Sequence, residues 1–239
     1  MGSHIENLIM EVTRKCNLTC EHCLRGDSQR MNFNPDNVIQ WIKDNNITSI
    51  RTITVTGGEP FLNAKGIKRF FDSVDVEINC IYLVTNGTIF NEDVLAAIFS
   101  MNKKCPMLED SDGTEGLILQ ISEDDFHFGE RNEGWNVIKW SPKKGRTYHD
   151  IDWLTPEGRA KDNGFGSCRK LRNPDPWVYH IDEGKDFFLI EGEFYISSNG
   201  MITRNCDLSY KSITKRQIGN IKKDKFCDLV INHGQIDMD

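Results

Sequence analysis

Residues 5–23 read IENLIMEVTRKCNLTCEHC, a strand-like apolar run followed almost at once by three cysteines. Cys16, Cys20 and Cys23 form a C-x3-C-x2-C pattern, while the other five of the eight cysteines are scattered along the chain. The first residues lack the basic region and the apolar stretch of a secretory signal, so we expect a cytoplasmic protein with reduced thiols. Grouped cysteines in such a protein indicate metal or cluster binding and not a disulfide framework.

The number of thiolates narrows what this run can bind. A structural zinc site needs four closed ligands, usually as two cysteine pairs, but the chain has a single C-x2-C pair. Three thiolates on one short loop suit a [4Fe–4S] cluster that keeps one iron open for another ligand. A zinc site completed by the distant Cys168 or Cys206 stays open as the alternative.

Strand-like and helix-like segments alternate along the first half of the chain. Asn34 and Pro35 have the residue types of an N-cap and a first helical position, and Asn91 is a second candidate N-cap. The expected strands are 5–12, 50–56, 77–85 and 117–122, and the expected helices begin at 35 and span 64–73 and 91–101. This alternation predicts parallel βα units, whose functional sites gather at the carboxyl ends of the strands.

The second half is less regular. Residues 187–196 and 201–204 flank Asn199-Gly200 and predict a β-hairpin. We therefore expect two parts, a main α/β domain over residues 5–180 and a small C-terminal extension over residues 181–239.

Composition excludes two classes of partner. The 239 residues contain 29 Lys and Arg against 36 Asp and Glu, a net charge of −7, so broad binding to nucleic acid phosphates is not expected. No run approaches the ~18 apolar residues of a membrane helix, so we expect no membrane contact.

Together with Thr56-Gly57-Gly58-Glu59-Pro60 after the second expected strand, the cysteine run resembles the radical S-adenosyl-L-methionine (AdoMet) superfamily. The resemblance implies an α/β fold, a partial (β/α)6 radical SAM barrel, here followed by a small extension containing a β-hairpin. It implies a [4Fe–4S] cluster on Cys16, Cys20 and Cys23, with AdoMet on the open iron. In that superfamily an electron from a reductant such as flavodoxin or ferredoxin cleaves AdoMet to methionine and a 5′-deoxyadenosyl radical, which abstracts hydrogen from a substrate.

The Gly-Gly-Glu-Pro motif has a chemical rationale under this resemblance. Gly57 and Gly58 have no side chain and let the backbone approach a ligand closely. Glu59 offers a carboxylate to the AdoMet ammonium, and Pro60 fixes the turn. An ordinary turn at the end of a strand is the plainer interpretation of the same residues.

Five other residues have a cofactor-binding and a plain interpretation. His22 precedes the third cysteine, where it either stacks beside adenine or is a simple loop histidine. Asn86 either contacts AdoMet or only forms a turn with its neighbours. Ser122 and Asp124 follow the fourth expected strand and either bind the ribose or methionine part of AdoMet or cap the next helix. Arg159 either faces the AdoMet carboxylate or lies on the surface.

The substrate is indicated only by the C-terminal segment. Gly200–Cys206 faintly resembles the start of the SPASM or twitch extensions found in peptide-modifying members, although no further C-x2-C pair follows. We therefore expect an extension without a cluster and a peptide or protein side chain as substrate. The alternatives are a nucleotide or other small metabolite as substrate, and, in another class, a non-catalytic zinc-binding or cluster-binding adaptor. The sequence identifies no catalytic acid or base.

Overall fold

The computed structural model describes residues 2–102, 116–122, 126–137, 143–144, 154–168, 176–182 and 187–236. Within these residues ten strands form a single sheet. The strands are β1 (Gly2–Thr13), β2 (Ile47–Gly57), β3 (Glu77–Thr85), β4 (Gly116–Ile121), β5 (Lys143–Lys144), β6 (Trp177–Asp182), β7 (Phe187–Ile196), β8 (Met201–Thr203), β9 (Gly219–Asn220) and β10 (Gly234–Ile236). The helices are α1 (Pro35–Asp44), α2 (Ala64–Ser73), α3 (Glu92–Asn102), α4 (Gly158–Asp162), α5 (Tyr210–Arg216) and α6 (Phe226–His233), with 3-10 turns η1 (Pro60–Asn63) and η2 (Glu133–Val137).

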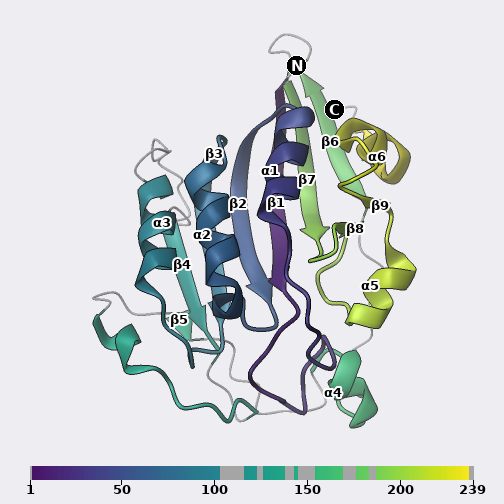
Figure 1. Ribbon diagram of the computed structural model, residues 1–239. Helices are drawn as coiled ribbons and strands as arrows, with labels where there is room; N and C mark the ends of the chain where they lie inside the picture. The colour runs from purple at the N-terminus through teal and green to yellow at the C-terminus, as the bar shows by residue number, and fades with distance from the viewer. Residues whose placement is uncertain are drawn as a thin grey trace.

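Six of the strands run parallel, in the spatial order β7-β1-β2-β3-β4-β5. Helices α1, α2 and α3 cover one face of this sheet (Figure 1). The carboxyl ends of the parallel strands point to one edge, where α4 also lies (Figure 1). This open parallel sheet confirms the expected α/β partial barrel. No helix in the described ranges is both long and apolar enough to cross a membrane.

The local signals in the sequence account for the helix starts. The Asn34 side chain accepts a hydrogen bond from the Asp36 amide at 3.0 Å, with Pro35 at the first helical position of α1. The Asn91 side chain accepts from the Val94 amide at 3.1 Å at the start of α3. Both contacts satisfy amides that a helix leaves without an internal partner.

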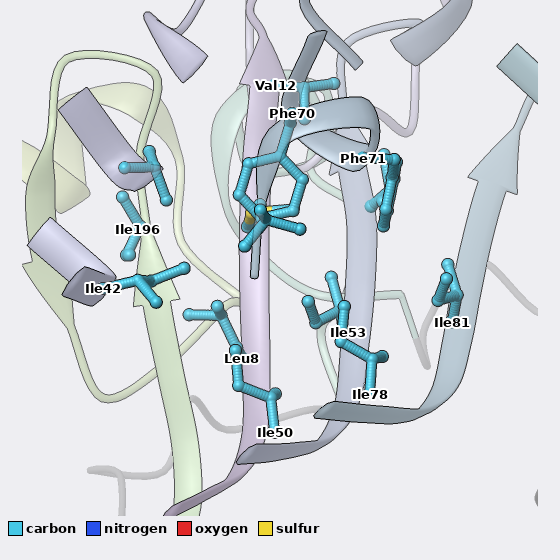
Figure 2. Packing of buried hydrophobic residues seen from close by; sticks show 14 of the residues in the cluster. Leu8, Val12, Ile42, Ile50, Ile53, Phe70, Phe71, Ile78, Ile81 and Ile196 are labelled. Atoms are coloured by element: carbon cyan, nitrogen blue, oxygen red, sulfur yellow. The ribbon is translucent and has the colours of Figure 1, made fainter. Parts of the chain in front are cut away.

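The main core lies between the helices and the sheet (Figure 2). Phe70 and Phe71 of α2 are buried against the isoleucines of β2 and β3, among them Ile53 and Ile81. Burial of a whole aromatic or aliphatic side chain stabilises a fold by about 1.5–3 kcal/mol, so this interface holds the helices on the sheet.

The expected hairpin is present, but its first strand belongs to the main sheet. Strand β7 pairs with β8 in antiparallel fashion and also with β1 in parallel, from Gly2 to Met10 of β1. Phe194 of β7 stacks on Trp41 of α1 and on Trp177 of β6, with ring centroids 5.4 and 4.8 Å apart. The C-terminal residues are therefore continuous with the main sheet and its core. The stacked aromatic rings hold them there, because Trp41 lies more than 130 residues before Trp177 and Phe194 in the sequence.

A second, smaller cluster packs apart from the main core. It contains Ile9 of β1, Tyr195 of β7, and Leu208, Tyr210 and Ile213 at the start of and within α5. Because neighbouring residues of a strand point to opposite faces, Ile9 and Tyr195 face away from the main core that holds Leu8 and Phe194. Helix α5 thereby covers the face of β1 and β7 opposite to α1.

Candidate active site

The three grouped cysteines line one cavity of about 240 Å³ at the carboxyl ends of the strands. The loop that holds them follows β1 and is stabilised by hydrogen bonds between its own residues. The Cys16 amide donates to Ser28 Oγ at 2.9 Å, and the Cys23 amide donates to the Cys20 carbonyl at 3.2 Å. Cys20 is buried, whereas Cys16 and Cys23 are partly exposed. The three cysteines therefore lie together around one cavity, as the sequence predicts.

The electrostatics around Cys16 and Cys20 favour the neutral thiol when no metal is bound. Burial, together with the neighbouring Cys16 and Cys23, raises the pKa of Cys20 to about 11. Burial also raises the pKa of Cys16. A metal ion reverses this balance because a coordinating thiol is deprotonated. Loading of the site therefore releases protons.

The spacing of the thiols bears on what they can hold. Within the described residues no three Cys, His, Asp or Glu side chains come close enough to share one metal ion. A single zinc ion requires all its thiolates about 2.3 Å away, whereas an iron–sulfur cluster spreads its ligands over several metal atoms. The donor set thus fits a cluster better than a lone zinc ion.

Gly57 and Gly58 allow close approach, but the partner is the cysteine loop. A Cβ on Gly58 would lie 2.2 Å from the Lys15 carbonyl oxygen, and one on Gly57 would lie 2.4 Å from that of Thr13. The Gly58 amide donates to Thr13 O at 2.8 Å, and the Glu59 amide donates to Lys15 O at 2.7 Å. The motif therefore joins the end of β2 to the start of the cysteine loop, while both glycines also line the cavity.

Glu59 has no exposed surface and acts within this wall. Its carboxylate accepts hydrogen bonds from Thr85 Oγ1 at 2.8 Å, the Asn86 amide at 2.8 Å and the Phe61 amide at 3.1 Å. Burial raises the pKa of Glu59, against the lowering effect of these donors. Pro60 is buried and begins η1. Neither Glu59 nor Pro60 is among the described residues that line the cavity, so both lie behind its wall. Their roles in AdoMet binding stay predictions.

Three of the other expected cofactor residues line the cavity. Asn86 and Ser122 line it, at the ends of β3 and β4, with the Ser122 amide bonded to Thr85 O at 2.8 Å. His22 lines it as well, and its ring lies 4.7 Å from the ring of His127. Asp124 lies outside the described residues. The structure thus brings together most of the residues that the sequence analysis selected.

Helix α4 closes over the cysteine loop, which the sequence analysis did not foresee. The Arg159 amide and Nε donate to the carbonyls of Cys23 and Cys20 at 2.9 and 2.8 Å, and its Nη1 contacts Asp27 at 3.1 Å. Gly158 has a φ of +55°, and a Cβ there would lie 2.4 Å from the Leu24 carbonyl oxygen. Arg159 therefore lines the cavity while it holds the loop. The sequence signal for this contact was Gly158 next to Arg159.

Arg25 and Tyr210 also line the cavity and were missed. The Tyr210 amide donates to the Arg25 carbonyl at 3.1 Å, which joins α5 to the cysteine loop. Behind them Glu11 of β1 binds Arg14 at 2.7 Å and accepts from the Tyr195 hydroxyl. Glu11 is a charged residue inside the apolar segment of residues 8–12, and that placement was the signal for a buried polar network.

Among the described residues, Cys168, Cys206 and Cys227 form no second metal site with other Cys, His, Asp or Glu side chains. Cys168 and Cys227 are exposed, and Cys206 is partly buried beside Glu193 and Asp207. Burial raises the pKa of Cys206 to about 12. In the part of the chain that the structure describes, no group of three potential ligands includes them. Support for a cluster-bearing SPASM or twitch extension is therefore missing.

Comparison with known proteins defines the class. Residues 10–108 match the sequence model of the Radical SAM superfamily. These residues therefore form a radical SAM domain. Enzymes with this domain use a [4Fe–4S] cluster and AdoMet as cofactors.

Two curated relatives and two solved structures illustrate the similarity. A GTP 3',8-cyclase of Rhodobacter capsulatus is 30% identical over 92 residues, which are 36% of this chain and 27% of that protein. An uncharacterized protein of Methanocaldococcus jannaschii is 32% identical over 111 residues, which are 44% of this chain and 38% of that protein. The chain thus spans about a third of the length of these relatives.

The structural neighbours share the fold. BtrN, crystallised with AdoMet and 2-DOIA, superposes with a TM-score of 0.53 at 13% identity, covering 96% of this chain and 83% of that one. Native anSMEcpe, with bound AdoMet and the Cp18Cys peptide, superposes with a TM-score of 0.51 at 12% identity, covering 96% and 80%.

Proposed function

We propose that the chain cleaves AdoMet reductively and uses the product to start chemistry on an organic substrate by hydrogen abstraction. The observation that carries the proposal is the meeting of Cys16, Cys20 and Cys23 with the Gly57-Gly58 turn in one cavity. When bound there, the cluster and AdoMet supply an electron and a 5′-deoxyadenosyl radical that takes a hydrogen atom from the substrate.

Different residues of the site have different proposed roles in this reaction. The three cysteines are the proposed cluster ligands, and Arg159 holds their loop through the carbonyls of Cys20 and Cys23. Gly57, Gly58, Asn86 and Ser122 form the wall on which we place AdoMet, with His22 beside its adenine. We assign Glu59 to orienting Asn86, because the Glu59 carboxylate accepts the Asn86 amide hydrogen bond. Asp124 and Pro60 remain predicted members of the same site.

Two substrate classes are proposed, each with its own support. A peptide or protein side chain follows from the C-terminal segment Gly200–Cys206, and anSMEcpe, which shares the fold, was crystallised with a peptide. A nucleotide or other small metabolite follows from the relatives that are named GTP 3',8-cyclase. A reductant such as flavodoxin or ferredoxin completes the proposed set of partners.

The test is anaerobic reconstitution with iron and sulfide, followed by EPR of the reduced protein and an assay for 5′-deoxyadenosine. We expect a [4Fe–4S] signal that AdoMet perturbs, and slow formation of 5′-deoxyadenosine. Replacement of Cys16, Cys20 and Cys23 by Ala should abolish both, whereas the Cys168→Ala and Cys227→Ala controls should retain them because these thiols are exposed elsewhere. A protein that contains zinc and does not respond to AdoMet would refute the proposal and favour a non-catalytic zinc-binding adaptor.

The substrate classes are separated by deuterium transfer. Deuterated GTP and a set of deuterated peptides would be supplied in parallel to the reconstituted protein. The true class transfers deuterium into 5′-deoxyadenosine and accelerates its formation. A nucleotide response with no peptide response would overturn the peptide proposal, and the reverse result would overturn the nucleotide proposal.

A further inference from the structure

The guanidinium of Arg25 is a buried cation without a carboxylate of its own. The residue is 9% exposed and lines the same cavity as the three cysteines. Its Nη1 donates to the Leu208 carbonyl at 2.7 Å, and its central carbon lies 5.0 Å from the centroid of the Tyr195 ring. Among the described residues no Asp or Glu oxygen lies within ion-pair distance of it. An arginine stays charged in a protein, so this charge persists at any working pH.

Among the described residues the carboxylate whose charge acts on Arg25 is Glu11, and other groups already bind it. Its Oε1 is taken by Arg14 at 2.7 Å and by the amide and hydroxyl of Ser198, both at 2.9 Å. Glu11 thus forms an ion pair with Arg14 and acts on Arg25 only from a longer distance. Arg159, the other cation on the cavity, already has Asp27 as a partner at 3.1 Å.

A buried charge with no carboxylate within ion-pair distance is costly, and an anion beside Arg25 would offset that cost. Arg25 lines the cavity that the three cysteines also line. A [4Fe–4S] cluster with three thiolate ligands bears a net negative charge, which increases by one when the cluster is reduced. A fixed cation nearby therefore favours the reduced state over the oxidised state, and net charge is among the factors that set the potential of such clusters.

We propose that Arg25 is the positioning residue whose fixed positive charge balances the cluster and favours its reduced form. This inference rests on the cluster site proposed above. A unit charge within about 10 Å, at an effective dielectric constant near 20, changes such an equilibrium by about tenfold. For a one-electron couple a tenfold change corresponds to about 59 mV.

The test is the reduction potential of the reconstituted cluster, measured by EPR-monitored titration without AdoMet or substrate. We expect Arg25→Met to lower the potential by about 59 mV. Arg25→Lys keeps the charge and should retain most of the wild-type potential. Arg69→Met is the matched control, because Arg69 is an exposed arginine that pairs with Asp36 and should leave the potential unchanged.

A second variant changes the charge in the opposite direction. Glu11→Gln removes the one carboxylate that partly offsets Arg14 and Arg25, so we expect the potential to rise. Loss of packing alone would not shift the two variants in opposite directions. This contrast separates an electrostatic role from damage to the buried network.

Several results would overturn the inference. One is an unchanged reduction potential in Arg25→Met at full iron content. Another is an equal shift of the potential in Arg25→Met and Arg25→Lys. The third is failure of both variants to load iron, because Arg25 would then only anchor Leu208. Iron loading by Arg25→Lys but not by Arg25→Met would support the charge requirement. If the wild-type protein takes up no [4Fe–4S] cluster, the proposed function itself fails, which is a different result from any of these.

Discussion

Gly58→Ala tests whether the glycine serves the protein backbone or a ligand. The added methyl group would lie 2.2 Å from the Lys15 carbonyl oxygen and 3.1 Å from Cys16 Cβ. The end of β2 must then move away from the cysteine loop. That movement breaks the two backbone hydrogen bonds from Gly58 to Thr13 and from Glu59 to Lys15.

The expected cost follows from these contacts. Overpacking of a well-packed site costs about 1–3 kcal/mol, and each lost backbone hydrogen bond costs about 1 kcal/mol. We therefore expect the free energy of unfolding of the apoprotein to fall by about 3–5 kcal/mol. For a chain of this length that loss lowers Tm by about 6–20 °C.

The assay is unfolding of the anaerobic, reduced apoprotein by urea and by heat. Gly164→Ala is the control, because a Cβ there meets no atom within 4 Å and the only penalty is the φ of +77°. That penalty is about 1 kcal/mol. If Gly58→Ala destabilises the apoprotein no more than Gly164→Ala, and lowers only AdoMet binding, the backbone explanation is refuted and the glycine serves the ligand.

Two further predictions concern the C-terminal half. With iodoacetamide at pH 8 and no metal, we expect the exposed Cys168 and Cys227 to be alkylated well before Cys206, whose pKa of about 12 leaves about one thiol in ten thousand ionised; equal rates by mass spectrometry would contradict this. Glu157→Gln should lower the free energy of unfolding at pH 7 by about 1–2 kcal/mol, because the carboxylate accepts hydrogen bonds from Ser209 and Ser212. Burial alone raises the pKa of Glu157, but these donors outweigh it and hold the pKa below its ordinary value. The stabilisation is therefore present above the ordinary pKa and lost as the pH falls through the lowered one, so the two proteins should converge in acid; a constant difference between pH 7 and pH 4 would contradict the assignment.

The sequence predicted those parts of the fold that depend on local patterns. The caps at Asn34 and Asn91 and the strand endings at Gly57 and Thr85 depend on residues within a few positions of one another, and the structure has them where they were expected. The C-x3-C-x2-C run is likewise local, and its three thiols meet in the cavity.

The contacts that were not predicted join residues far apart in the chain. Arg159 binds the Cys20 carbonyl across 139 residues, and Ser198 binds Glu11 across 187. Hydrophobic periodicity carries no information on such pairs, since it reports which face of an element is buried and not against what. The close approach of Gly58 to the Lys15 carbonyl was not predicted for the same reason, because no motif reveals a backbone neighbour. Its contact with AdoMet stays a prediction.

The pairing of β7 with β1 also has a consequence for synthesis of the chain. One edge of β1 is complete once β2 has been made, but its other edge waits for residues 187–196. At about 5–20 residues per second, the ribosome needs roughly ten to forty seconds to reach them after β1 has emerged. During that time an apolar strand has unpaired backbone groups, which is a site for association with other chains. Helices α4 and α5 also arrive late, so the cysteine loop is uncovered for most of translation and can receive its metal before those helices close over it.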